Sequence, residues 1–170
     1  MGELPKREGL RLKSYDYSKG GAYFVTICTQ DRSHLLSKIH APCPIAYTDL
    51  QLRLTPIGRI VEKYLLSSEN IPGVKIDGYI IMPDHIHAMI LLNPSEYTAQ
   101  GCGTSRAPSP TNEMLPHVIS TFKRFCHKEV GRGIFQRSYQ EHIIRDREDY
   151  LAHIRYIYEN PARWFYAHNT

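Results

Sequence analysis

The stretch VKIDGYIIMPDHIHAMILL (74–92) decides the fold of this chain. Residues 74–82 and 85–92 are both rich in β-branched and aliphatic side chains, which predicts two strands. Only two residues separate these runs, so the strands are predicted to pair as a tight antiparallel hairpin. Side chains two positions apart on a strand point to the same face. His85 and His87 therefore share one face of the predicted sheet, while the alternating apolar residues Ile86, Ala88 and Ile90 share the other.

The chain before this hairpin supplies another strand and a helix. Residues 22–29 are β-branched and aromatic, which predicts a strand. Thr55 is a favoured N-cap and Pro56 suits the first helical position, and apolar residues then recur at helical spacing, so a helix is predicted over 56–69. Between them, the weak alternation of 34–54 predicts a short hairpin.

The chain after the hairpin is predicted to contain a loop, a helix, a strand and a last helix. Residues 93–112 are rich in Pro, Gly, Ser and Thr, which predicts a mobile surface loop. A helix is predicted over 113–130 and a strand over 139–145. Asp146 can cap a last helix, and Pro161 is predicted to end it, because the residue before a proline is pushed away from helical geometry.

The order of elements predicts the fold class. Strand, helix, strand, strand, helix, strand matches the split β-α-β plan, so we expect an α+β, ferredoxin-like (RRM-like) antiparallel sheet with both helices on one face. The final helix is extra to this plan. Packed on the open face, it would bring Tyr156 close to His85 and His87. The 170 residues suit a single domain over 1–170, with a basic arm over 1–20.

Composition limits the function classes. Hydrophobic residues make up 42% and charged residues 22%, which is typical of a globular protein. No apolar run approaches the roughly 20 residues that span a bilayer, and the basic N-terminal residues lack the apolar run typical of a signal peptide, so we expect a cytoplasmic protein without a membrane partner. The four cysteines form no CxxC pair and are expected to be reduced thiols. A net charge of +4 permits a polyanionic partner without requiring one.

Two residues of the last helix make the histidines chemically interesting. Tyr156 and Asn160 are four apart and share one helical face. Two imidazoles with an oxygen ligand from Asn or Glu, leaving positions open for phosphate and water, fit Mg²⁺ or Mn²⁺ better than a structural zinc site, which normally takes four N or S ligands. A phenol beside such a metal indicates cleavage of a phosphodiester bond through a covalent tyrosyl intermediate.

Each of these residues also has a simpler interpretation. Alternating strand histidines are often structural, an asparagine before a proline is a common helix C-cap, and Tyr139 on the preceding strand is a competing nucleophile. Tyr158 lies about 200° around the helix from Tyr156 and should face away. Two other functions stay open: an RRM-like module that binds single-stranded nucleic acid without cutting it, and a small metallohydrolase acting on nucleotides, which leaves Tyr156 without a role.

Five segments together resemble a known family. They are LKSYDY (12–17), YFVT (23–26), MPDHIH (82–87), FQRSYQEHIIR (135–145) and YIYENP (156–161). In this order they are similar to the REP-associated tyrosine transposases, relatives of the single-tyrosine HUH transposases. The resemblance covers nearly the whole chain, and its Pro-x-His-hydrophobic-His and Tyr-x-x-x-Asn-Pro motifs are specific when they occur together.

The resemblance implies a function and assigns roles. It implies metal-dependent cleavage and rejoining of single-stranded DNA that carries hairpins, by a monomer or homodimer. His85, His87 and Asn160 would bind the divalent metal, and Tyr156 would attack the phosphate to give a 5′-phosphotyrosine and a free 3′-hydroxyl. Asp84 stands where relatives often carry Asn or Glu. Basic residues that are candidates for phosphate contacts, each of which could equally be a solvated surface charge, are Arg7, Arg11, Lys13, Lys123, Arg124, Arg137 and Arg145.

Overall fold

A four-stranded antiparallel sheet forms the centre of the molecule. The computed structural model describes residues 20–40, 50–99 and 114–169. The sheet has the strand order β4-β5-β1-β6, and each neighbouring pair is antiparallel. Its strands confirm the four predicted ones, and they are β1 (Gly21–Cys28), β4 (Val74–Ile81), β5 (His85–Leu92) and β6 (Gln140–Ile144).

Helices flank this sheet, and a small second sheet lies beside it. The predicted helices over 56–69 and 113–130 are confirmed, and the predicted hairpin within 34–54 is present as a separate two-stranded sheet. None of the described helices is long and apolar enough to cross a membrane. The remaining elements are η2 (Gln30–Arg32), β2 (Ser37–His40), β3 (Gln51–Leu54), α1 (Pro56–Ser67), η3 (Ser68–Asn70), α2 (Pro94–Ala99), α3 (Met114–Val130) and α4 (Arg147–Asn169).

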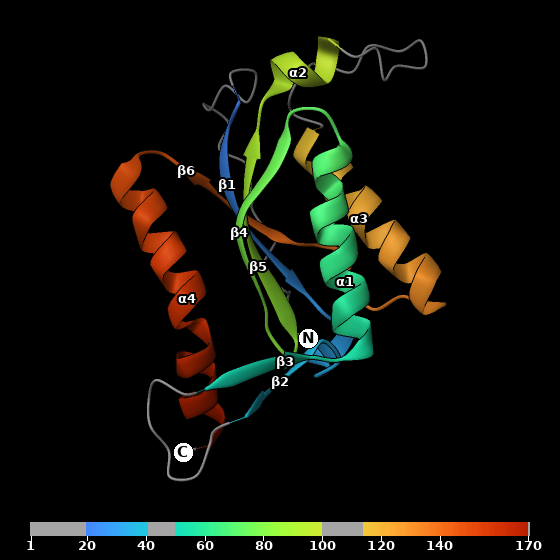
Figure 1. Cartoon of the computed structure of the whole chain (residues 1–170), viewed down its shortest axis with the longest axis vertical. Coiled ribbons are helices and arrows are strands. Elements are labelled where there is room, and N and C mark those ends of the chain that lie inside the picture. Colours follow the sequence, from blue (N-terminus) through green and yellow to red (C-terminus); the bar gives the residue numbers. More distant parts are fainter. Residues whose placement is uncertain (1–19, 41–49, 100–113, 170) are drawn as a thin grey trace, which may run out of the picture.

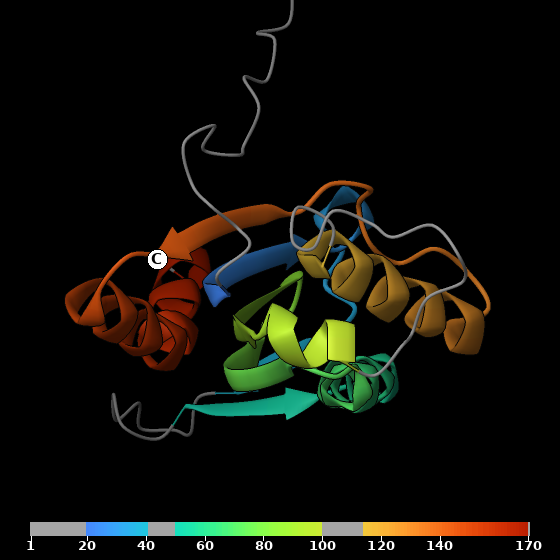
Figure 2. The same cartoon turned by 90° about the horizontal axis from the view of Figure 1, so that it is seen from above.

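The two faces of the sheet carry different layers. Helices α1 and α3 pack on one face (Figure 1), where Ile86, Ala88 and Ile90 are buried in the main hydrophobic core, as the alternation of β5 predicts. Helix α4 lies on the opposite face, seen from above in Figure 2, where Phe24, Met89 and Ile157 form a smaller cluster. The face that carries the two histidines is thus the face that α4 covers.

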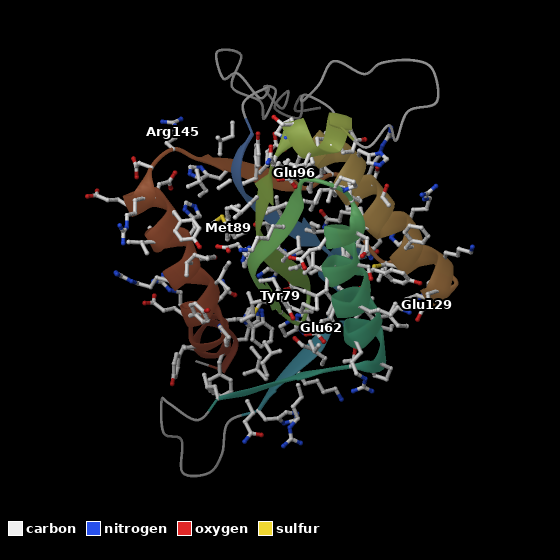
Figure 3. All side chains as sticks on the ribbon, turned by 45° about the horizontal axis from the view of Figure 1, so that its top comes forward. Glu62, Tyr79, Met89, Glu96, Glu129 and Arg145 are labelled. Atoms are coloured by element: carbon white, nitrogen blue, oxygen red, sulfur yellow. The ribbon has the colours of Figure 1, made fainter. Side chains whose placement is uncertain are left out.

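Local hydrogen bonds stabilise helix α1 and attach it to the sheet. Thr55 caps α1 as predicted, because its hydroxyl oxygen accepts a hydrogen bond from the Gly58 amide at 3.0 Å. On the same side, the Tyr79 hydroxyl donates to Glu62 at 2.9 Å and ties β4 to α1 (Figure 3). Burial is the main cause that raises the pKa of Tyr79 to about 12, with the Glu62 hydrogen bond second, so this phenol stays a donor at neutral pH.

Helix α4 approaches β4 at a glycine. The pairing of β4 with β5 shifts register between Ile76 and Gly78, which places Asp77 in a bulge. Asp77 accepts a hydrogen bond from the Tyr150 hydroxyl of α4. A β-carbon at Gly78 would lie only 3.1 Å from the Ile154 side chain, so the absence of a side chain there allows the close packing of the helix.

Two sequence predictions need correction here. Helix α4 does not end before Pro161 but continues through it to Asn169. Proline removes one helical hydrogen bond at a cost of about 3 kcal/mol. Beyond Pro161 the continued helix places the Trp164 ring edge-on to that of His34, with centroids 5.4 Å apart. In the predicted loop 93–112, residues 94–99 form helix α2, and the rest of the loop lies outside the described residues.

Candidate active site

The two histidines of β5 face each other at the centre of the site. The register places His87 opposite Thr26 of β1 and His85 opposite Cys28. Both side chains are buried, and their Nε2 atoms lie 3.0 Å apart. Neighbouring ligands of an octahedral cation with bonds of about 2.0–2.1 Å lie about 2.9 Å from each other. The spacing of the two nitrogens therefore fits two adjacent positions on one Mg²⁺ or Mn²⁺ ion.

The other nitrogen of each ring is held by a neighbouring side chain. Nδ1 of His85 lies 2.6 Å from Oδ1 of Asp84, and Nδ1 of His87 lies 2.8 Å from Oγ1 of Thr26. With Nδ1 as the N–H donor in both contacts, both Nε2 lone pairs point into the site. Such outer partners orient metal-binding imidazoles in proteins. Sequence reasoning left the role of Asp84 open, and the structure places its carboxylate as the support of His85.

A third residue, Arg32, completes this support. Its Nε lies 3.0 Å from Oδ2 of Asp84, so the carboxylate bridges a guanidinium and an imidazole. Burial opposes ionisation of Asp84, but the hydrogen bond from His85 and the charge of Arg32 outweigh it, and the pKa of Asp84 is lowered. The carboxylate therefore stays charged and keeps its orienting bond.

Burial also controls the protonation of His87. Burial first, and then the nearby charges of His85 and Arg32, lower the pKa of His87 to about 3. The ring is consequently neutral across the physiological range. A neutral imidazole is the form that binds a metal ion.

Tyr156 reaches this pair from helix α4. Its ring centroid lies 5.2 Å from that of His87, edge-on, and 6.0 Å from that of Phe24. The residue is 37% exposed, so a bulky substrate can reach it. The guanidinium of Arg163 lies 5.7 Å from the Tyr156 ring centroid and is paired with Glu159 at 2.8 Å. Sequence reasoning missed Arg163, although its position seven residues after Tyr156 puts both on one helical face.

Asn160 lies one turn beyond Tyr156 on the same helix. Because α4 continues to Asn169, Asn160 is an interior helical residue, and its interpretation as a C-cap is wrong. Its side chain is only 5% exposed. Because Asn160 is buried inside the helix, its side chain neither caps a helix terminus nor faces solvent. The structure thus brings together His85, His87 and Tyr156, and buries Asn160 one turn further along.

The three tyrosines weighed against Tyr156 point elsewhere. Tyr158 is 77% exposed, which confirms that it faces away from the histidines. Tyr150 donates its hydroxyl hydrogen bond to Asp77. Tyr139, the competing nucleophile, packs against the main core on the α1 and α3 side, with the Lys123 ammonium 5.6 Å from its ring centroid. Among the tyrosines of helix α4 named here, Tyr156 has the ring that contacts His87.

The basic residues predicted to contact phosphate fall in different places. Lys123 is 8% exposed, and its ammonium donates to the carbonyl oxygens of Gln136, Arg137 and Ser138 at 2.8–3.3 Å, so it serves the fold. Burial lowers its pKa. Arg137 and Arg124 line a cavity of about 540 Å³ beside α3, away from the histidines. Arg145 is exposed where β6 meets α4 (Figure 3). Arg7, Arg11 and Lys13 lie outside the described residues.

Comparison with known proteins identifies relatives of this chain. No family model matches the sequence. A putative REP-associated tyrosine transposase of Haemophilus influenzae is 31% identical over 154 residues, which are 89% of this chain and 76% of the relative. The REP-associated tyrosine transposase of Escherichia coli K12 is 22% identical over 147 residues, 86% of this chain and 70% of the relative.

A solved structure shares the fold. The structure of a REP-associated tyrosine transposase bound to a REP hairpin superposes with a TM-score of 0.59 at 20% identity, covering 91% of this chain and 74% of that one. The order of the sequence segments, the facing histidines beside a tyrosine and the similarity over most of both chains lead to one assignment. The chain belongs to the REP-associated tyrosine transposases.

Proposed function

We propose that this chain is one HUH-type single-tyrosine domain that cleaves and rejoins single-stranded, hairpin-bearing DNA through a 5′-phosphotyrosine intermediate. One observation carries the proposal: the facing Nε2 atoms of His85 and His87, 3.0 Å apart, with the ring of Tyr156 5.2 Å from that of His87. We assign the sheet to the ferredoxin-like class, with α4 as an added helix that presents the tyrosine on the open face.

His85, His87 and Asn160 would hold the metal. Two imidazole nitrogens with anchored rings and a buried amide oxygen fit Mg²⁺ or Mn²⁺ with positions left for substrate. When bound, the ion supplies Lewis-acid polarisation of the scissile phosphate. Asp84 and Thr26 keep both imidazoles in the tautomer that directs Nε2 into the site.

Tyr156 performs the bond exchange. Its hydroxyl oxygen attacks phosphorus, the bond between phosphorus and the 3′-oxygen breaks, and the phenol proton is lost as the 3′-oxygen gains one. Arg163, whose guanidinium lies over the Tyr156 ring at 5.7 Å from its centroid, is the nearby cation that we assign to stabilising the negative charge developing on the phenol. The phosphotyrosine keeps the energy of the broken bond, so a 3′-hydroxyl can reverse the step without ATP.

The substrate class follows from the family and from charge. A relative has been solved with a REP hairpin, which supports hairpin DNA as the partner of this chain too. Exposed Arg124, Arg137 and Arg145 are available for phosphate contacts, together with Arg7, Arg11 and Lys13 of the N-terminal arm. We further propose that the protein acts in the cytoplasm as a monomer or homodimer.

A covalent adduct tests the proposal. The wild-type protein with Mn²⁺ and a hairpin-bearing single strand should give a protein–DNA species that survives SDS electrophoresis. Tyr156→Phe should bind the same DNA without forming this species, because only the hydroxyl is removed. Tyr158→Phe is the matched control and should form it. A wild-type protein that binds DNA but never becomes attached would instead support a non-catalytic binding module.

A further inference from the structure

A cluster of two histidines and an aspartate, residue types that commonly bind metal ions, lies where β6 joins α4. His142 comes from β6, and Asp149 and His153 come from the first two turns of α4 (Figure 1). Nε2 of His142 lies 2.9 and 3.0 Å from the two carboxylate oxygens of Asp149, and Nδ1 of His153 lies 3.0 Å from one of them. The proposed strand-transfer reaction uses none of these three residues.

We propose that His142, Asp149 and His153 bind a transition-metal ion of the zinc class. Two imidazoles and one carboxylate, with a water molecule in the fourth position, form a common tetrahedral zinc donor set. Ligands about 2.0–2.2 Å from a tetrahedral zinc ion lie about 3.4 Å apart. The nitrogen–oxygen distances here are about half an ångström shorter, so a small separation of the side chains would admit the ion.

The surroundings of the cluster suit this role. His142 has a side-chain exposure of 46%, so an ion can reach the cluster from solution. The Arg145 amide donates to Oδ2 of Asp149 at 3.1 Å and orients the carboxylate. Nδ1 of His153 also lies 2.8 Å from the Asp149 carbonyl oxygen, a hydrogen bond that coordination would replace. The two histidine rings are stacked, with centroids 4.5 Å apart, which keeps their donor edges together.

The consequence is a cross-link between β6 and the helix that carries Tyr156. His153 precedes Tyr156 by three residues, and its ring centroid lies 4.7 Å from that of Phe24, which also contacts Tyr156. A metal ion at this cluster would join strand to helix and restrain the helical turn before the tyrosine. The binding itself is independent of the proposed strand-transfer chemistry. Only this effect on Tyr156 rests on that function.

The test measures zinc binding after the facing histidine pair has been removed. In His85→Ala/His87→Ala protein, we expect one equivalent of Zn²⁺ to bind, and Co²⁺ to give the visible absorption bands of a tetrahedral site that Zn²⁺ then displaces. Adding His142→Ala or Asp149→Asn should weaken Zn²⁺ binding more than tenfold. Adding His117→Ala, an exposed histidine on α3, should leave the affinity unchanged.

Three outcomes would overturn the proposal: no bound equivalent in the double variant, binding that survives both His142→Ala and Asp149→Asn, or binding lost equally in the His117→Ala control. A second measurement tests the cross-link. Zn²⁺ should slow amide hydrogen exchange over 149–156 in the double variant but not when His142→Ala is added. Binding without slower exchange would overturn the restraint of the helix. Because no DNA chemistry is measured, failure of the proposed function leaves this result unaffected.

Discussion

Replacing Asp84 should weaken metal binding although its carboxylate is proposed to support a ligand rather than to be one. The Asp84 side chain is 7% exposed, and Oδ1 lies 2.6 Å from Nδ1 of His85 while Oδ2 lies 3.0 Å from Nε of Arg32. Asp84→Ala removes both bonds and frees the imidazole of His85 to rotate. Loss of such an outer partner typically costs 10–100-fold in metal affinity, or about 1.4–2.7 kcal/mol.

The backbone at Asp84 should survive this change. Its carbonyl oxygen accepts hydrogen bonds from the amide and the hydroxyl of Thr29, both at 2.9 Å, and neither bond involves the Asp84 side chain. Asp84→Asn should lose less affinity, because an amide oxygen can still accept from His85. Asp31→Asn removes the same charge from an exposed neighbouring position and is the matched control.

Calorimetric titration with Mn²⁺ measures the effect, and circular dichroism checks the fold. We expect the affinity order wild type and Asp31→Asn, then Asp84→Asn, then Asp84→Ala. An Asp84→Ala protein that binds Mn²⁺ within twofold of the wild type would refute the reasoning. The His85–Asp84 bond would then have no part in shaping the site.

Three further predictions concern stability. The pKa of His87 is about 3 in the folded protein and ordinarily 6.5, so the unfolded chain binds more protons than the folded one between pH 3 and 6.5. The stability contributed by His87 is therefore fully present above pH 6.5 and is lost as pH falls toward 3. In urea denaturation, His87→Gln should reduce this dependence of the free energy of unfolding on pH. Gly78→Val should push Ile154 away, lowering the free energy of unfolding by about 1–3 kcal/mol and slowing adduct formation, whereas Gly133→Ala, with open space around it, should do neither. Thr55→Ala should cost about 1 kcal/mol in chemical denaturation through loss of the α1 cap, and a cost near zero would show that the cap contributes nothing.

Local patterns in the sequence were sufficient for the sheet and for one face of the site. The alternation of 85–92 determines that His85 and His87 share a face, because side chains alternate along any strand whatever it packs against. The Thr55 cap and the apolar spacing of α1 are likewise local properties. The four-residue separation of Tyr156 and Asn160 sets their common helical face in the same way.

Other features depended on contacts between distant segments. The proline rule predicts an end at Pro161, yet α4 continues to Asn169, and beyond the proline the Trp164 ring contacts that of His34. A rule for local backbone geometry does not include such contacts between distant segments. Its positive charge makes Lys123 a candidate for DNA contact in the sequence. In the folded structure, its ammonium instead donates to three carbonyl oxygens of the loop 136–138.

The support of the histidines belongs to the tertiary structure alone. Thr26 reaches His87 because β1 pairs with β5 across 61 positions of sequence, and no periodicity within either strand encodes that register. Asp84 and Arg32 meet through the segment that follows β1. The sequence by itself determined which side chains could form a site and on which faces they lie. The pairing of strands and the packing of α4 decided which of them meet, because contact depends on the positions of separate elements in space.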